Sequence, residues 1–103
     1  MKELKGSEKQ IIWAEKIREI LINSVNEKSV PNIYHIFTKT EKGKKFIDEL
    51  KKSKEDNPNF FTNENMSNQF VIAKIRGLVE EETNSKTFIE NQTILSFLIV
   101  ILK

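Results

Sequence analysis

Histidine and cysteine, on which many metal sites and nucleophilic active sites depend, are almost absent from this chain of 103 residues. His35 is the only histidine, and there is no cysteine. A metalloprotease helix needs two histidines, and thiol nucleophiles and most structural zinc sites need cysteine. With three glycines in all, the chain has no phosphate-binding loop, and it has no Gly-x-Ser-x-Gly nucleophile elbow. We therefore expect a protein that is not an enzyme, with no catalytic residue, metal ligand or cofactor.

The charged residues suggest binding rather than catalysis. Residues 39–54 hold seven lysines, diluted by Glu41, Asp48 and Glu49. This stretch predicts either a solvated helix face or a contact with phosphates or an acidic protein. Because no arginine lies there, binding to nucleic acid would be non-specific and salt-dependent. The candidate partner-binding residues in this stretch are Lys42, Lys44, Lys45, Lys51, Lys52 and Lys54.

The other candidate partner-binding residues are three consecutive glutamates and the only tryptophan. Glu80, Glu81 and Glu82 end a predicted helix, where negative charge is unfavourable for the helix dipole, so they are either solvated or an acidic patch for a basic partner. Trp13 lies in the best amphipathic stretch of the chain. It is expected to pack in the core, with a partner-binding anchor as the alternative, because tryptophan is enriched at interface hot spots.

The element that must position Trp13 is a helix from Ser7 to about Asn26. Ser7 is a good N-cap, and Gln10 stands where a capping box needs its second member. The spacing predicts that this helix buries one wide face and leaves its charged residues, Arg18 among them, off that face. The residues expected on the buried line are Trp13, Ile17, Ile20, Leu21 and Ser24.

Further helices are expected along the rest of the chain. Pro31 suits the first turn of a second helix, and residues 32–53 form either one bent helix or two short ones, with Gly43 near the boundary. A strong apolar pattern runs from Met66 to about Glu82. We therefore expect residues 1–103 to form a single all-α domain, a compact bundle of four to five helices.

The apolar segment Thr93–Leu102 is open to three interpretations. It is a buried helix continuing from Ser85, a strand favoured by its Ile and Val content, or an exposed end that forms a homodimer or binds a partner. It is too short to span a bilayer, which takes ~20 residues.

Composition limits the choice of environment and partner. Hydrophobic residues make up 38% and charged residues 31% of the chain, and the net charge is +2, too small to argue for nucleic acid from overall charge. The chain starts with a polar stretch, which is not a secretory signal, and the lack of cysteine fits a reducing compartment. These features predict a cytoplasmic protein.

Two stretches carry a family resemblance. Gly6–Ile22, GSEKQIIWAEKIREILI, resembles a GSEKQIxWAxxIR motif of small uncharacterised proteins of bacteria, phages and mobile elements. Residues 84–92, NSKTFIENQ, are similar to a second motif near the C-terminus of that group. The resemblance implies that the first and last helices pack together, and it brings no known activity. The abundance of Ile, Lys and Asn fits the AT-rich genome of a bacterium or its phage.

These observations favour a small protein that works by binding another protein. By analogy with small phage proteins, its partner is expected to be a host enzyme that it inhibits, such as a CRISPR defence nuclease. The alternatives are a nucleic-acid-binding accessory protein that acts through residues 39–54, and a self-assembling helical structural protein.

Overall fold

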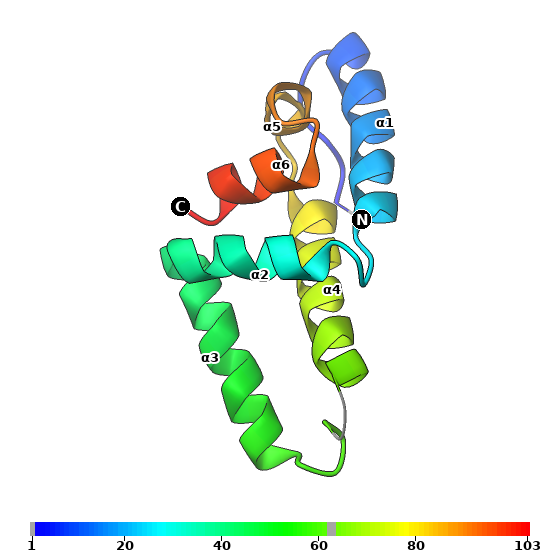
Figure 1. Ribbon diagram of the computed structural model, residues 1–103. Helices are drawn as coiled ribbons and strands as arrows, with labels where there is room; N and C mark the ends of the chain where they lie inside the picture. The colour runs from blue at the N-terminus through cyan, green and yellow to red at the C-terminus, as the bar shows by residue number, and fades with distance from the viewer. Residues whose placement is uncertain (1, 62–63) are drawn as a thin grey trace.

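The chain folds into six helices within the part that the computed structural model describes, residues 2–61 and 64–103 (Figure 1). The predicted all-α bundle is confirmed. The helices are α1 (Glu8–Ser24), α2 (Val30–Lys39), α3 (Glu41–Asp56), α4 (Glu64–Glu81), α5 (Ser85–Glu90) and α6 (Ile94–Ile101).

Residues 32–53 belong to two helices, and so do the residues from Ser85 to Ile101. The number of helices is therefore higher than the expected four to five. Thr40 takes an extended backbone conformation with φ −122° and ψ 148°, so residues 32–53 form two helices rather than one. Thr93 is extended in the same way, and its hydroxyl accepts from the backbone N–H of Ser96. The C-terminal apolar segment is therefore a helix of its own, and not a strand or a continuation of α5.

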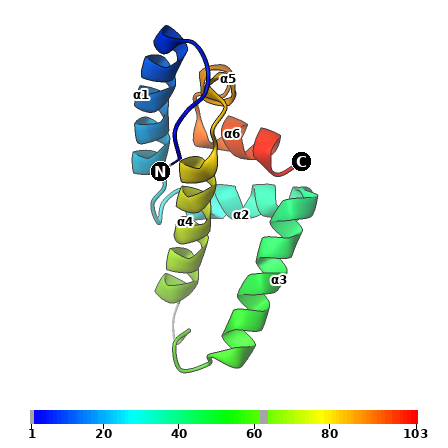
Figure 2. The same ribbon diagram turned by 180° about the vertical axis from the view of Figure 1, so that it is seen from behind.

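The helices are arranged along a long axis (Figures 1 and 2). Helices α1 and α5 lie side by side at one end, α2 crosses the middle, and α3 and α4 run to the other end. Helix α6 lies along α2. The molecule measures 47 × 22 × 22 Å. Since α1 packs on α5, the prediction that the first helix meets the C-terminal end of the bundle is confirmed.

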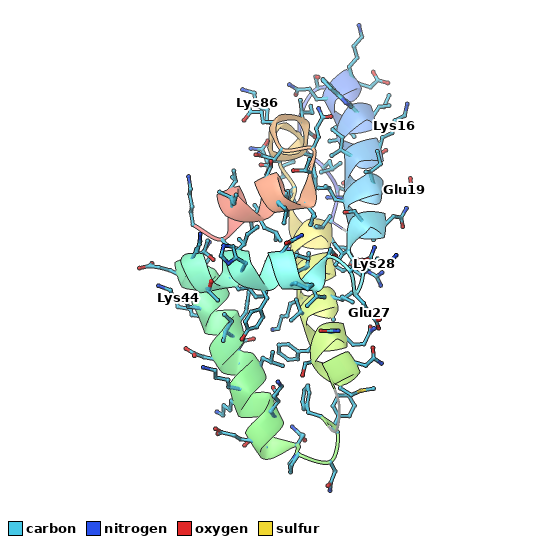
Figure 3. The ribbon with its side chains drawn as sticks, in the orientation of Figure 1. Lys16, Glu19, Glu27, Lys28, Lys44 and Lys86 are labelled. Carbon is cyan, nitrogen blue, oxygen red and sulfur yellow. The ribbon has the colours of Figure 1, made fainter. Side chains whose placement is uncertain are left out.

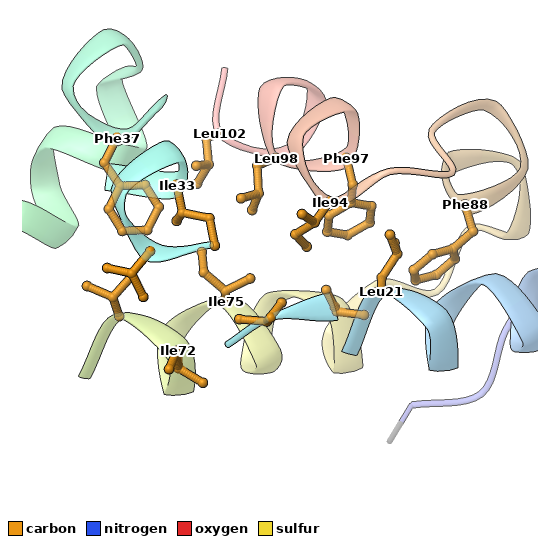
Figure 4. Close-up of a cluster of buried hydrophobic side chains, with 14 of the residues drawn as sticks. Leu21, Ile33, Phe37, Ile72, Ile75, Phe88, Ile94, Phe97, Leu98 and Leu102 are labelled. Carbon is orange, nitrogen blue, oxygen red and sulfur yellow. The ribbon is translucent and has the colours of Figure 1, made fainter. Parts of the chain in front are cut away.

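The core is a continuous row of apolar side chains that links all of these helices (Figure 4). The rings of Phe88 and Phe97 stack at 5.3 Å, which joins α5 to α6. Helix α6 buries Phe97 and Leu98 completely, but its other side leaves Ile99 and Val100 nearly half-exposed. Of the interpretations of this segment, a helix buried all round is therefore wrong, because α6 lies on the surface of the bundle and has core on one side only.

The N-terminal residues tie α1 to the end of α4. The backbone N–H of Lys5 donates to the Thr83 carbonyl at 2.6 Å, and the Ser85 N–H donates to the Lys5 carbonyl at 3.1 Å. These hydrogen bonds form a parallel bridge between Lys5 and Asn84. Gly6 follows with φ +149°, a conformation that L side chains rarely adopt, and turns the chain into α1.

A close backbone approach joins α2 to α3. A Cβ atom at Gly43 would lie 2.5 Å from the Cα atom and 2.7 Å from the carbonyl oxygen of Phe37, so only glycine fits at this corner. Further along, the ammonium of Lys74 in α4 pairs with Glu49 in α3 at 2.8 Å and lies above the Phe46 ring at 5.5 Å. This contact bridges the two helices that form the far end of the molecule.

None of the helices within the described residues is long and apolar enough to cross a membrane.

The glycines provide a matched test of the fold. Gly43→Ala is expected to lower the free energy of unfolding by about 1–3 kcal/mol, because the new methyl group collides with the Phe37 backbone. Gly77→Ala in α4 is expected to raise it by about 0.5–1 kcal/mol, because alanine suits a helix interior and meets nothing within 4 Å. Urea denaturation measures both, and equal shifts for the two variants would contradict the Gly43 corner.

Candidate protein-binding surface

Helix α1 begins with the capping box that its sequence predicts. The Ser7 hydroxyl accepts from the Gln10 backbone N–H at 3.3 Å, and the Gln10 side-chain oxygen accepts from the Ser7 N–H at 3.0 Å. Two of the backbone donors left free at a helix N-terminus are satisfied in this way. The first turn of the helix is thereby held in place next to Gly6.

The face that α1 buries carries an arginine. Arg18 is 6% exposed, its guanidinium lies 5.3 Å from the centre of the Phe88 ring, and its terminal nitrogen donates to the Glu82 carbonyl. Burial lowers the pKa of Arg18, while the nearby carboxylates of Glu15, Glu82 and Glu80 act in the opposite direction. An arginine stays charged in proteins, so a cation is fixed between α1, α4 and α5.

The orientation of α1 corrects the sequence prediction. The residues buried in the helix are Ala14, Ile17, Arg18 and Leu21. Trp13 is 50% exposed and Ile20 is 61% exposed, so the expectation that both pack in the core is wrong. The expectation that Arg18 lies off the buried face is also wrong. The physical reason is that the Phe88 ring and the Glu82 carbonyl give the guanidinium partners inside.

As a result, α1 presents apolar side chains to solvent. Ile12, Trp13 and Ile20 are all half-exposed or more. Ile12 and Trp13 are neighbours, and Ile20 follows Trp13 after seven residues, about two turns, so all three lie on one side of the helix. Lys9 and Lys16 are exposed on the same side. Figure 3 shows Lys16 pointing away from the body of the molecule. We define the α1 outer face by these residues: Lys9, Ile12, Trp13, Lys16 and Ile20.

The lysines predicted as a binding site lie on α3, and all six are exposed. They alternate with five carboxylates of the same helix, which leaves a net charge of +1 over α3 (6 − 5). Lys44 stands four residues before Asp48, and Asp48 stands four residues before Lys52, a spacing that puts opposite charges side by side. This arrangement favours a solvated helix surface over a continuous basic one.

Of the three glutamates at and after the end of α4, Glu82 makes a hydrogen bond within the fold through its side chain. The Glu82 carboxylate accepts from the Asn84 N–H at 2.9 Å, and its carbonyl accepts from Arg18. The Glu80 carbonyl accepts from the Lys2 N–H at 3.2 Å, while the Glu80 and Glu81 side chains are exposed. Since Glu82 is half-buried and hydrogen-bonded, the patch presents two free carboxylates rather than three.

The surface of the described residues has hollows. The larger of two that we describe, about 760 Å³, opens between α2, α3 and α4 over Val30, Leu50 and Val71. The smaller of the two, about 580 Å³, lies between the N-terminal segment, α1 and the end of α4, and includes Arg18 and Glu80. His35 is exposed on α2 and lines neither hollow. Among the described residues, no three His, Asp or Glu side chains gather as metal ligands would.

The exposure of Ile20 was missed in the sequence. A signal for it was present, because Ala14, Ile17, Leu21 and Val25 form a second apolar line at helical spacing beside that of Trp13. A small residue such as Ala14 lets a neighbouring helix approach closely, which makes this second line the better candidate for the buried face.

Comparison of the chain with family models, with curated proteins and with solved structures gives no match. The function is therefore argued from the geometry of the chain itself.

Arg18 offers a test of how α1 is held. Arg18→Ala is expected to lower the free energy of unfolding by about 2–4 kcal/mol, because it removes a charged hydrogen bond and a cation–π contact and leaves the Glu82 carbonyl unpaired. Lys16→Ala on the exposed side of the same helix is the control and should change stability by about 0.5 kcal/mol or less. If the two variants lose similar amounts of stability in thermal denaturation, Arg18 does not hold α1 in place.

Trp13 offers a test of which face is outside. Trp13→Gln and Ile20→Gln are each expected to cost about 1 kcal/mol or less, as exposed positions do. Leu21→Ala is expected to cost about 2–5 kcal/mol, because this side chain is fully buried. Acrylamide should quench the emission of Trp13, the only tryptophan. A protected emission and a large loss for Trp13→Gln would contradict the orientation of α1.

Proposed function

We propose that this protein works by binding another protein, and that the α1 outer face is the contact surface. The observation that carries the proposal is the exposure of three large apolar side chains, Ile12, Trp13 and Ile20, on one side of a single helix. A cluster of this kind on a protein surface is typical of an interaction site, and tryptophan is one of the residues enriched among interface hot spots.

The way in which α1 is held supports this use. Its N-terminus is capped by Ser7 and Gln10, and Arg18 anchors its inner side on Phe88 and Glu82. A helix that is already fixed loses little conformational freedom when a partner docks on it. The binding surface would therefore be preorganised, with Trp13 near its centre.

The partner class follows from analogy alone. If the resemblance to phage and mobile-element proteins holds, a host enzyme such as a CRISPR defence nuclease is the first partner to test, with inhibition as the outcome. The α3 lysines are the competing surface. The charge-reversed variant at Lys44, Lys45, Lys51 and Lys52 should keep partner binding if the α1 outer face is the site.

A photo-crosslinking amino acid at position 20 tests the proposal directly. In cells that naturally carry the protein, irradiation is expected to join this position to a second, different protein, because Ile20 is 61% exposed within the contact surface. The same group at position 52, exposed on α3, is the matched control and should give no such adduct. Adducts from position 52 but not from position 20 would overturn the proposal.

A further inference from the structure

The α1 outer face has a positively charged centre. Lys16 stands four residues after Ile12, three after Trp13 and four before Ile20, so its ammonium lies among all three apolar side chains. Lys9 stands three and four residues before Ile12 and Trp13. The one ion pair among the described side chains is the one between Lys74 and Glu49. Among the described residues, no carboxylate therefore lies within ion-pair distance of either lysine.

One edge of the same helix is negatively charged. Glu8, Glu15 and Glu19 follow at intervals of seven and four residues, which aligns them along one side of α1. Glu15 and Glu19 also border the smaller hollow beside the N-terminal segment. Figure 3 shows Glu19 directed outward below Lys16. A partner on the α1 outer face thus meets lysines in the middle and carboxylates along one margin.

A second copy of the chain fits this charge pattern poorly. In an antiparallel pair of α1 helices in which Ile12 of one chain covers Ile20 of the other, the two-fold axis passes beside residue 16, which is halfway between them. A parallel pair also places each residue beside its own copy. In both arrangements the Lys16 ammonium of one chain faces that of the other, and like charges opposed in an interface are costly.

Nucleic acid fits poorly as well. The exposed charges of α1 are three carboxylates and two lysines, Lys9 and Lys16, so the helix as a whole exposes a net negative charge. A base could stack on the Trp13 ring beside the two lysines, but a nucleic-acid backbone that crosses the α1 outer face would meet the carboxylate edge on its far side. Binding to nucleic acid depends on neutralising phosphates with cations, and two lysines among three carboxylates do not supply this.

We infer that the α1 outer face docks an amphipathic helix of the partner protein. The apolar stripe of that helix carries carboxylates opposite Lys9 and Lys16. One margin of the stripe is basic and lies opposite Glu15 and Glu19. This inference rests on the proposed function and adds the chemistry of the partner. Helix-on-helix docking suits α1 because its apolar side chains recur at helical spacing, the pattern that a second helix reads with its own anchors.

A displayed library of helical peptides tests the inference without knowledge of the natural partner. Each peptide has a fixed apolar stripe, and the positions beside it are drawn from Glu, Lys and Ser. Selection on the protein is expected to enrich Glu over Lys about tenfold at positions beside the centre of the stripe, equivalent to ~1.4 kcal/mol. Selection on Lys16→Glu should reverse this preference towards Lys.

Two further baits serve as controls. Lys44→Glu, an equal change of charge on α3, should leave the preference of the library unchanged. Trp13→Gln should abolish selection, because it removes the apolar anchor without disturbing the core. Helical circular dichroism confirms that each bait is folded. The inference is wrong if Glu and Lys are enriched equally, or if Lys44→Glu changes the preference as much as Lys16→Glu does.

Other occupants give distinct results. A homodimer in light scattering that Trp13→Gln converts to a monomer would assign the face to a second copy. Retention of the protein on a single-stranded oligonucleotide, lost in Lys16→Glu, would assign it to nucleic acid. Either result overturns the inference. If position 20 crosslinks to another protein while the library shows no charge preference, the proposed function stands and the acidic helix does not.

Discussion

The structure depends on the junction at which the N-terminal segment meets the end of α4. The Lys5 N–H donates to the Thr83 carbonyl, and the Ser85 N–H donates to the Lys5 carbonyl, so two stretches nearly 80 residues apart are joined backbone to backbone. Gly6 then turns the chain directly above the fully buried Ser85. Because α1 starts at this turn and α5 starts at Ser85, the junction brings the first turns of both helices together.

Arg18 joins the middle of α1 to the same region of the chain. Its guanidinium reaches across to the Glu82 carbonyl and lies on the Phe88 ring, so residues on either side of the junction also fix how α1 is rotated. A buried cation restricts a helix more than an apolar side chain does, because its hydrogen bonds have direction and are costly to leave unmade. Once Arg18 is inside, Trp13 and Ile20 have to be near the surface.

The opposite end of the molecule is built on different principles. Helix α3 is anchored by its close approach to α2 at Gly43, and it reaches α4 chiefly through side chains, with Lys74 lying between Glu49 and the rings of Phe46 and Phe70. The larger hollow opens in the space that remains between these helices. The other end of the molecule, which has the capping box and the backbone bridge, carries α1 and its apolar outer face.

The sequence by itself determined the features that depend on neighbouring residues. These include the all-α class, the Ser7–Gln10 capping box and the place of Pro31 in the first turn of α2, because each follows from hydrogen bonds or backbone preferences within three or four positions. Only the tertiary structure decided the rotation of α1 and the exposed side of α6. Two apolar lines compete on α1, and both satisfy helical spacing equally well. The choice between them was made by Phe88 and Glu82, which lie more than 60 residues away along the chain and which no local pattern around Arg18 reveals.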